Sequence, residues 1–192
     1  MSKKTYSENF FSEIHKKKIH HLFKVLDTDG SGVLSPVDFA CVGEQIIAKS
    51  GLSKSERKSK VVLLKAHRLF IQLLTDIENP ELTIELWEWV SFFKNQIESA
   101  DREILDHYIQ RTSRHIFDLF DSDRDGFIDH DEYIDMLSAY RISAHIATES
   151  FQELDSNDDN RISKEEMING LNNFFLSDDE KAKGNLIFGG WK

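Results

Sequence analysis

The chain has 192 residues, of which 40% are hydrophobic and 14 are Phe, so it can bury a substantial core and is not expected to be disordered. Its formal net charge is −10 at pH 7. No nucleic-acid partner is expected, because phosphate contacts need clustered Lys and Arg on a basic surface.

The first predicted unit is a helix that leads directly into an acidic loop. The stretch FFSEIHKKKIHHLFKVL places apolar residues on one face at helical spacing: Ile19, Leu22, Phe23 and Leu26. The next twelve residues, DTDGSGVLSPVD, carry oxygen groups at places 1, 3, 5, 7, 9 and 12 and Gly32 at the sharp turn, as a Ca²⁺-binding loop does. The candidate ligands are Asp27, Asp29, Ser31, the carbonyl of Val33, Ser35 and Asp38.

The last ligand place of this loop departs from the usual pattern. Place 12 normally holds Glu, and Asp38 is one methylene shorter. We expect Asp38 to reach the ion with one oxygen, which lowers the coordination number toward the six that Mg²⁺ requires. Mg²⁺ is therefore expected to compete with Ca²⁺ especially at this first site, and a loop that has lost its ion is the alternative.

The second loop is aligned on residues 75–86, TDIENPELTIEL, and this frame has no carboxylate at places 1, 3, 5 or 12. Pro80 stands at the turn. We expect a degenerate loop with a structural role, whose unit pairs with the first one and packs Leu82 and Trp87 inward.

The third loop, DSDRDGFIDHDE, matches the calcium-loop pattern at every place. Gly126 stands at the turn, and Glu132 is expected to supply two oxygens. The candidate ligands are Asp121, Asp123, Asp125, the carbonyl of Phe127, Asp129 acting through water, and Glu132.

The fourth loop, DSNDDNRISKEE, matches with one substitution, since Asn160 replaces Gly at the turn. Asn tolerates a positive φ better than other non-Gly residues, so the turn is expected to survive. The candidate ligands are Asp155, Asn157, Asp159, the carbonyl of Arg161, Ser163 and Glu166.

Aligned in phase, the four segments share an apolar eighth and thirteenth place, and their ninth place holds good helix N-caps. The sequence therefore predicts an all-α fold of four helix–loop–helix units in two pairs that form one compact unit. We expect residues 1–100 to form the first pair, residues 101–176 the second, and residues 177–192 a tail that docks on the core between the pairs.

Three further features of the sequence bear on its surface and its ligands. The basic stretch HKKKIHHLFK is predicted to be a solvated helix face, with contact to anionic lipid as the alternative. Aromatic residues at helical spacing are expected to be core, although they could line a ligand cavity: Trp87, Trp89, Trp191, Phe92, Phe93, Phe174 and Phe175. The chain has only 3 Met, whereas calcium sensors that bind many targets use Met-rich surfaces. This favours a buffer or a dedicated regulator.

Three intact loops, a degenerate second loop and the ending FFLSDDEKAKGNLIFGG make the chain resemble the sarcoplasmic calcium-binding proteins and the related calexcitins, a family of EF-hand proteins. The resemblance implies two facing EF-hand pairs, Ca²⁺ and Mg²⁺ binding and a cytosolic location. Coelenterazine-binding proteins and photoproteins look similar in plan, but the tail lacks the His–Trp–Tyr group that light emission would need.

The leading expectation is a cytoplasmic Ca²⁺/Mg²⁺ buffer with three active sites. The alternative is a calcium-gated signalling module or a carrier of a small hydrophobic ligand, with a protein target left open. No enzyme activity is expected, because no phosphate-binding loop, dinucleotide fingerprint or nucleophile elbow occurs. Cys41 alone permits no internal disulfide, no apolar run is long enough to span a membrane, and we expect a monomer.

Overall fold

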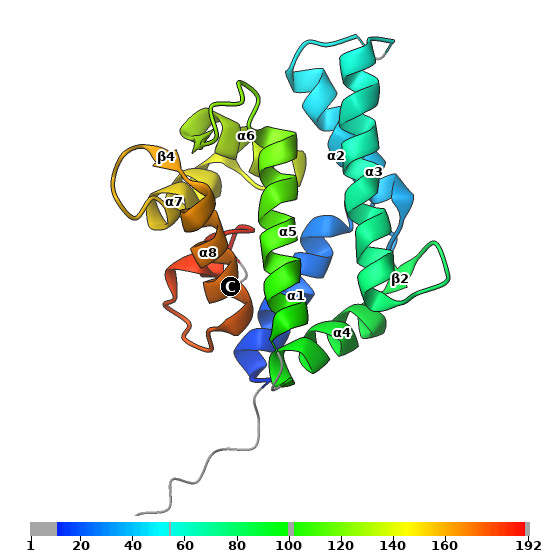
Figure 1. Ribbon diagram of the computed structural model, residues 1–192, viewed down its shortest axis with the longest axis vertical. Coiled ribbons are helices and arrows are strands. Elements are labelled where there is room, and N and C mark those ends of the chain that lie inside the picture. The colour runs from blue at the N-terminus through cyan, green and yellow to red at the C-terminus, as the bar shows by residue number, and fades with distance from the viewer. Residues whose placement is uncertain (1–10, 54, 100–101, 191–192) are drawn as a thin grey trace, which may run out of the picture.

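The computed structural model describes residues 11–53, 55–99 and 102–190. Within them, eight α-helices flank four loops, and each loop carries a two-residue strand (Figure 1). The helices are α1 (Glu13–Leu26), α2 (Pro36–Lys49), α3 (Arg57–Ile77), α4 (Leu86–Glu98), α5 (Glu103–Phe120), α6 (His130–Ala139), α7 (Ala144–Leu154) and α8 (Lys164–Leu176). A short 3₁₀ helix, η1 (Lys183–Leu186), follows in the tail.

The helix that leaves each intact loop begins where the sequence places an N-cap. Ser35 caps α2, Asp129 caps α6 and Ser163 caps α8, and each takes part in a capping box with the carboxylate three residues later. Pro36 is the first residue of α2, where a missing backbone N–H costs nothing. The loop-to-helix junctions are therefore set by local sequence.

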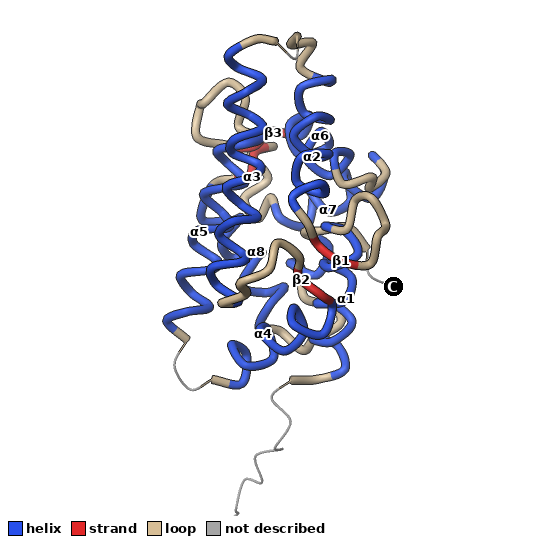
Figure 2. Tube along the Cα trace, turned by 90° about the vertical axis from the view of Figure 1, so that its right-hand side faces the viewer, coloured by secondary structure: helices blue, strands red, loops and turns tan. Residues whose placement is uncertain are grey.

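Two short antiparallel ladders join the loops in pairs. β1 (Val33–Leu34) pairs with β2 (Ile84–Glu85), and β3 (Ile128–Asp129) pairs with β4 (Arg161–Ile162). The first loop is thus tied to the second, as Figure 2 shows for β1 and β2, and the third loop is tied to the fourth. The predicted all-α fold of paired helix–loop–helix units is confirmed.

The ladder also corrects the frame of the second loop. Leu34 faces Ile84 across the ladder, as Ile128 faces Ile162, so the second loop begins at Ile77 and not at Thr75. Leu82 and Trp87 were expected to pack inward, but they are 70% and 64% exposed. Ile84 and Trp89 fill the equivalent positions and are fully buried.

The predicted frame of the second loop was wrong because two frames fit the sequence equally well. The pairs Leu82/Trp87 and Ile84/Trp89 have the same spacing of five residues, so both frames satisfy the apolar pattern of the repeat. Only the hydrogen-bonded register of the ladder separates them. The helix cap moves with the frame, since Glu85 rather than Thr83 caps α4.

One continuous core joins the two halves of the molecule. Phe93 of α4 stacks on Phe175 of α8 with ring centroids 5.0 Å apart, and Tyr108 of α5 meets both rings edge-on. Helix α5 runs through the middle of the molecule and contacts helices of both pairs (Figure 1). The four units therefore share a single hydrophobic interior, as expected for one compact unit.

The basic stretch on α1 is only partly a solvated face, which corrects the sequence prediction. Lys18 is fully buried and His15 is 4% exposed, because this side of α1 lies against the C-terminal segment. The Lys18 ammonium donates to the Ser177 carbonyl at 2.5 Å and to the Asn185 side-chain oxygen at 3.3 Å. Burial lowers the pKa of Lys18 to about 8, against the opposing attraction of Asp178.

The tail packs mainly on the second pair and reaches back to α1. Ile187 is fully buried, and its carbonyl accepts a 3.0 Å hydrogen bond from Tyr133. The Phe188 ring meets Phe174 edge-on at 5.1 Å, and the Phe188 carbonyl lies 2.8 Å from Nε2 of His21. Trp191 lies outside the described residues.

None of the described helices combines the length and the apolar character needed to cross a membrane.

Candidate metal centres and the adjoining cavity

The first loop gathers three carboxylates around one point. Oxygens of Asp27, Asp29 and Asp38 lie within 4.8 Å of one another. Gly30 and Gly32 adopt φ of 73° and 84°, which lets the backbone turn inside the ring of ligands. Hydrogen bonds from Ser31, whose backbone N–H donates to Asp29 at 2.9 Å, lower the pKa of Asp29, so this exposed side chain stays ionised. The predicted Asp ligands of this loop are thus brought together.

Asp38 is fully buried and both of its oxygens are held by the loop. Oδ2 accepts from the Ser35 backbone at 2.8 Å, and Oδ1 accepts from the Asp29 backbone at 3.2 Å. The Ser31 hydroxyl meanwhile donates to the Val33 carbonyl at 3.0 Å, so these two predicted ligands lie side by side.

The third loop has the same arrangement with a longer carboxylate at its end. Asp121, Asp123 and Glu132 bring their oxygens within 4.8 Å of one another. Oε1 of Glu132 accepts from the Ser122 backbone at 2.7 Å, and Oε2 accepts from Asp129 at 3.2 Å. Glu132 therefore spans the loop from its second to its ninth place.

One oxygen of this loop shows that a cation fits the site. Oδ1 of Asp121 is buried and has no hydrogen-bond partner within the described residues. A buried carboxylate oxygen without a partner is costly, and a hard cation at the centre of the loop would satisfy it. The Asp125 carboxylate is paired with Arg161 of the fourth loop at 3.2 Å, so it would have to turn inward to bind an ion.

The fourth loop keeps its turn without glycine. Asn160 has φ of 62°, which confirms the sequence expectation that Asn would adopt this conformation. Asp155 accepts from the Asp159 backbone at 3.2 Å and from the Asn160 backbone at 2.9 Å. The Asp159 carboxylate accepts from the Asn157 amide at 3.1 Å, so these two predicted ligands contact each other.

Glu166 is the place-12 carboxylate of the fourth loop. Its oxygens accept from the backbone of Ser156 at 2.9 Å and of Ser163 at 2.9 Å. Burial would raise the pKa of Glu166, but hydrogen bonds from Ser163 and Ser156 outweigh it and hold the pKa below its ordinary value. Glu166 is therefore charged and placed as Glu132 is.

The second loop, in its corrected frame, is closed by an amide. Asn79 occupies place 3, and its Nδ2 donates to Glu88 at place 12 at 2.8 Å and to the Thr83 carbonyl at place 7 at 3.0 Å. Its Oδ1 accepts from the Glu81 backbone, as the place-3 side chain does in the three intact loops. The Asn79 amide group thus links two groups that would bind a cation in an intact loop, while Ile77 supplies no side-chain oxygen at place 1.

A second feature is an apolar cavity between the two helix pairs. It has about 50 Å³ of space open to the centres of water molecules, which is room for a few waters. Its wall includes Leu22, Leu69, Tyr108, Met136, Tyr140 and Phe188, which come from α1, α3, α5, α6, the C-cap of α6 and the tail. Burial raises the pKa of the Tyr108 and Tyr140 hydroxyls, so both remain protonated donors.

Sequence reasoning did not identify this cavity. The aromatic residues proposed as a possible lining lie elsewhere, since Trp89, Phe93 and Phe174 are fully buried core and Trp87 is exposed. The lining comes from helices that are far apart in the sequence, so periodicity within one helix could not reveal it. The available signal was Tyr108 and Tyr140, polar-tipped residues on otherwise apolar faces.

Comparison with known proteins identifies the architecture. Two family models, each described as an EF-hand domain pair, match residues 110–171 and residues 7–41. The luciferin-binding protein of Renilla reniformis is 26% identical over 179 residues, which cover 91% of this chain and 93% of that protein.

Two solved structures show the same fold over nearly the whole chain. The coelenterazine-binding protein of Renilla muelleri, in its calcium-loaded apo form, has a TM-score of 0.79 at 22% identity and covers 96% of this chain and 99% of its own. The sarcoplasmic calcium-binding protein of amphioxus has a TM-score of 0.66 at 15% identity, with 92% and 97% covered.

Proposed function

We propose that this chain, which belongs to the EF-hand proteins and shares the four-hand plan of the sarcoplasmic calcium-binding proteins, is a calcium-controlled carrier of a small apolar molecule. Calcium binding is the general property of these proteins. The carrier role rests on one observation, the apolar cavity walled by both helix pairs and the tail. The likeness to a luciferin-binding and a coelenterazine-binding protein supports an aromatic ligand of that class.

The ions would occupy the first, third and fourth loops, giving three sites per chain. Asp27, Asp121 and Asp155 would supply the first ligand of each loop, and Asp38, Glu132 and Glu166 the last. Mg²⁺ would compete with Ca²⁺ especially at the first loop, because the short Asp38 side chain favours six-coordination. The second loop would stay free of ions, because its Asn79 amide bridges two of the groups that would otherwise bind one.

A chain of contacts links an ion ligand to the cavity wall. Glu132 is the last ligand of the third loop, and the next residue, Tyr133, is fully buried. The Tyr133 hydroxyl lies 2.7 Å from Ser150 and donates to the carbonyl of Ile187 at 3.0 Å. Phe188, next in sequence, lines the cavity. A shift of Glu132 toward an ion would therefore move α6 against the segment that closes the cavity.

The dimensions of the cavity bear on this proposal. Pockets for small organic ligands usually measure about 300–1,000 Å³, far more than the present cavity. A ligand would have to displace Phe188 or separate the helix pairs. We therefore propose that the conformation described is the closed, unloaded one, in which the tail fills the space that a ligand would take.

A Ca²⁺/Mg²⁺ buffer is the second candidate, favoured by the small size of this cavity and by the scarcity of Met on the surface. In either role we propose a cytoplasmic monomer without catalytic activity. The single Cys41 supports a reducing compartment, because it leaves no partner for an internal disulfide.

The two functions differ in one measurement. Coelenterazine should be titrated into the full chain in EDTA and in excess Ca²⁺, and binding followed by quenching of protein fluorescence. The carrier proposal expects saturable one-to-one binding whose affinity differs between the two conditions. Absence of binding in both, with three Ca²⁺ bound per chain, would leave the buffer as the function.

A pair of variants ties any binding to the cavity. Leu69→Phe adds volume to the cavity wall and should weaken binding. Leu82→Phe makes the same change at a side chain that is 70% exposed, and should leave binding unchanged. Equal affinity in the two variants would place the ligand elsewhere.

A further inference from the structure

The positive charge of this acidic protein is concentrated in one segment. Residues 49–68 contain seven Lys and Arg and one acidic residue, Glu56, whereas the whole chain carries −10. The seven basic residues are Lys49, Lys54, Arg57, Lys58, Lys60, Lys65 and Arg68. This segment runs from the end of α2 into the first half of α3. The formal charge of this segment is therefore opposite in sign to that of the whole chain, although Lys49 is paired with Asp135.

Helix α3 arranges part of this charge in an ordered pattern. At 3.6 residues per turn, one side of α3 carries seven residues, and all of them are exposed: Arg57, Lys60, Val61, Leu64, Arg68, Ile71 and Thr75. This side carries three cations and three aliphatic side chains, and no carboxylate lies on it. Leu64 and Ile71 are 66% and 61% exposed. We call these seven residues the outer face of α3.

The opposite side of α3 is fully used by the fold. Ala66, Phe70 and Leu73 are buried in the interior. Lys65 donates to the Asp118 carbonyl on α5, and Asp76 forms an ion pair with Arg111, also on α5. The core contacts of α3 are therefore made by other residues, and the exposed aliphatic residues of the outer face are not needed for them.

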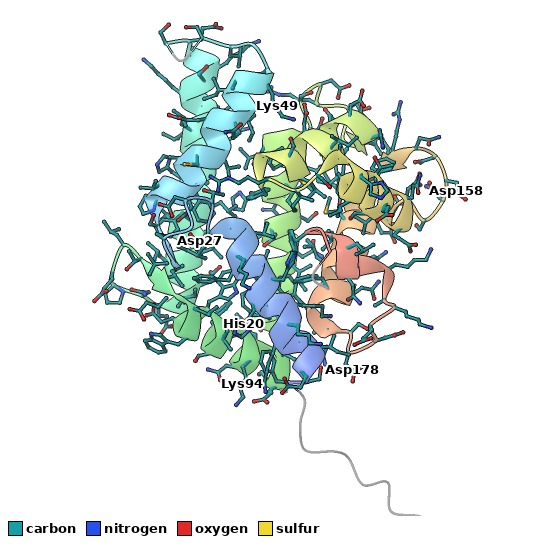
Figure 3. The ribbon with its side chains drawn as sticks, turned by 180° about the vertical axis from the view of Figure 1, so that it is seen from behind. His20, Asp27, Lys49, Lys94, Asp158 and Asp178 are labelled. Carbon is teal, nitrogen blue, oxygen red and sulfur yellow. The ribbon has the colours of Figure 1, made fainter. Side chains whose placement is uncertain are left out.

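The position of α3 makes the outer face accessible to a large flat partner. The α2–α3 hairpin extends beyond the rest of the molecule, and α3 lies along one edge (Figure 1). Lys49 marks the far end of α2 and is well separated from Asp27 in the first loop (Figure 3). From Arg57 to Ile71 the outer face is about 21 Å long, at 1.5 Å per residue.

We propose that the outer face of α3 binds the surface of an anionic phospholipid membrane. A helix that lies in a membrane interface needs cations for the lipid phosphates and aliphatic side chains that enter the acyl boundary. Lys and Arg beside Leu and Ile meet both needs, because their long stems follow apolar surface while the charge stays in water.

An acidic protein segment would pair with the cations of the outer face but would leave its aliphatic side chains in water. A flat lipid surface can contact the cations and the aliphatic side chains along the whole outer face. The charge of the remaining chain opposes such binding, so the attraction depends on the hairpin facing the membrane with the acidic loops turned away. Binding to the membrane should weaken as the salt concentration rises, because ions screen the charges of an exposed contact.

Co-sedimentation of the full chain with vesicles tests this. We expect binding to vesicles of phosphatidylcholine mixed with phosphatidylserine, and little binding to phosphatidylcholine alone, both in EDTA. Arg57→Glu/Lys60→Glu should reduce the vesicle partition coefficient by about tenfold or more, since each basic residue contributes severalfold near an anionic surface. Lys16→Glu/Lys17→Glu on α1 makes the same change of charge and should have a smaller effect.

A second pair of variants isolates the aliphatic contribution. Leu64→Gln/Ile71→Gln keeps the charge and should lower binding to the mixed vesicles, whereas Leu82→Gln/Trp87→Gln, also exposed, should not. Far-ultraviolet circular dichroism and melting temperature would confirm that each variant is folded. The proposal is overturned if the chain does not pellet with anionic vesicles, or if the α1 and α3 charge variants behave alike. Retention on immobilised poly-glutamate without vesicle binding would instead indicate an acidic protein partner.

Discussion

The amide nitrogen of Asn79 lies 2.8 Å from Oε1 of Glu88, inside the second loop. Because the same nitrogen also donates to the Thr83 carbonyl, it joins groups at places 3, 7 and 12 of the loop. In an intact loop a divalent cation joins these places. The second hand is thus closed by hydrogen bonds of its own, and its strand pairs with that of the first loop.

The first prediction concerns this closure. Asn79→Ala removes all three hydrogen bonds of the side chain and leaves the Glu88 carboxylate without that partner, so it should lower the unfolding free energy by about 1–3 kcal/mol. The number of bound Ca²⁺ ions should stay at three, as counted by native mass spectrometry. Asn79→Asp should be destabilised in EDTA by repulsion from Glu88 and partly restored by millimolar Ca²⁺. If Ca²⁺ shifts the melting temperatures of Asn79→Ala and Asn79→Asp equally, the amide does not stand in for an ion.

The second prediction concerns pH. Lys18 has a pKa of about 8 in the folded chain, lowered by burial from its ordinary 10.5. Between these values the unfolded chain binds a proton that the folded chain has released, so this residue makes stability rise with pH. Relative to Lys18→Met, the wild type should gain roughly 1–2 kcal/mol of unfolding free energy between pH 8 and pH 10.

Chemical denaturation at several pH values measures this difference. Lys17→Met is the matched control, because Lys17 is exposed on the same helix and should show the wild-type pH dependence. Tyr side chains of the unfolded chain begin to titrate near the upper limit, but they are common to all three proteins and cancel in the comparison. Parallel stability curves for wild type and Lys18→Met would contradict the prediction.

The third prediction concerns the tail. Gly184 is buried against the backbone of Gly170 on α8, and a Cβ there would overlap the Gly170 carbonyl oxygen. Gly184→Ala should therefore displace η1 and lower the melting temperature by several degrees, as expected for a loss of about 1–3 kcal/mol. Gly190→Ala is the control, because a Cβ at Gly190 meets nothing within 4 Å. Ending the chain after Gly184 should destabilise it in the same way, through loss of the buried Ile187.

The parts of this structure that follow from local chemistry were predictable. Ser35 and Ser163 begin helices because their side chains cap the first turn, and Asn160 replaces glycine because Asn accepts a positive φ. The candidate ligands of the first and third loops follow from the spacing of their oxygens, and the carboxylates of Asp121 and Glu132 do lie together.

The parts that depend on contacts between distant segments were not predictable. The frame of the second loop is decided by the pairing of Leu34 with Ile84, 50 residues apart in the sequence. Lys18 is a basic residue on a basic helix, and its burial depends on Ser177 and Asn185 of the tail. The same holds for the cavity, whose wall joins α1 to Phe188.

The last prediction concerns Asp38 and the choice of ion. In the third and fourth loops the place-12 Glu reaches the backbone N–H of the second place, Ser122 at 2.7 Å and Ser156 at 2.9 Å. Asp38 is shorter, and its Oδ1 accepts instead from Asp29 at 3.2 Å. One oxygen of Asp38 is therefore the expected ion ligand, which suits the six-coordinate Mg²⁺.

Asp38→Glu should restore a two-oxygen clamp, raise the affinity of one site for Ca²⁺ and reduce Mg²⁺ competition at that site alone. The reverse change in the third loop, Glu132→Asp, should introduce Mg²⁺ competition there. Calorimetric titration with Ca²⁺, with and without millimolar Mg²⁺, measures both effects. A Mg²⁺-filled first site takes up Ca²⁺ only after Mg²⁺ leaves, so stopped-flow mixing should show one slow Ca²⁺-binding phase in the wild type that disappears in Asp38→Glu. If that phase persists unchanged in Asp38→Glu, the length of the place-12 carboxylate does not select the ion.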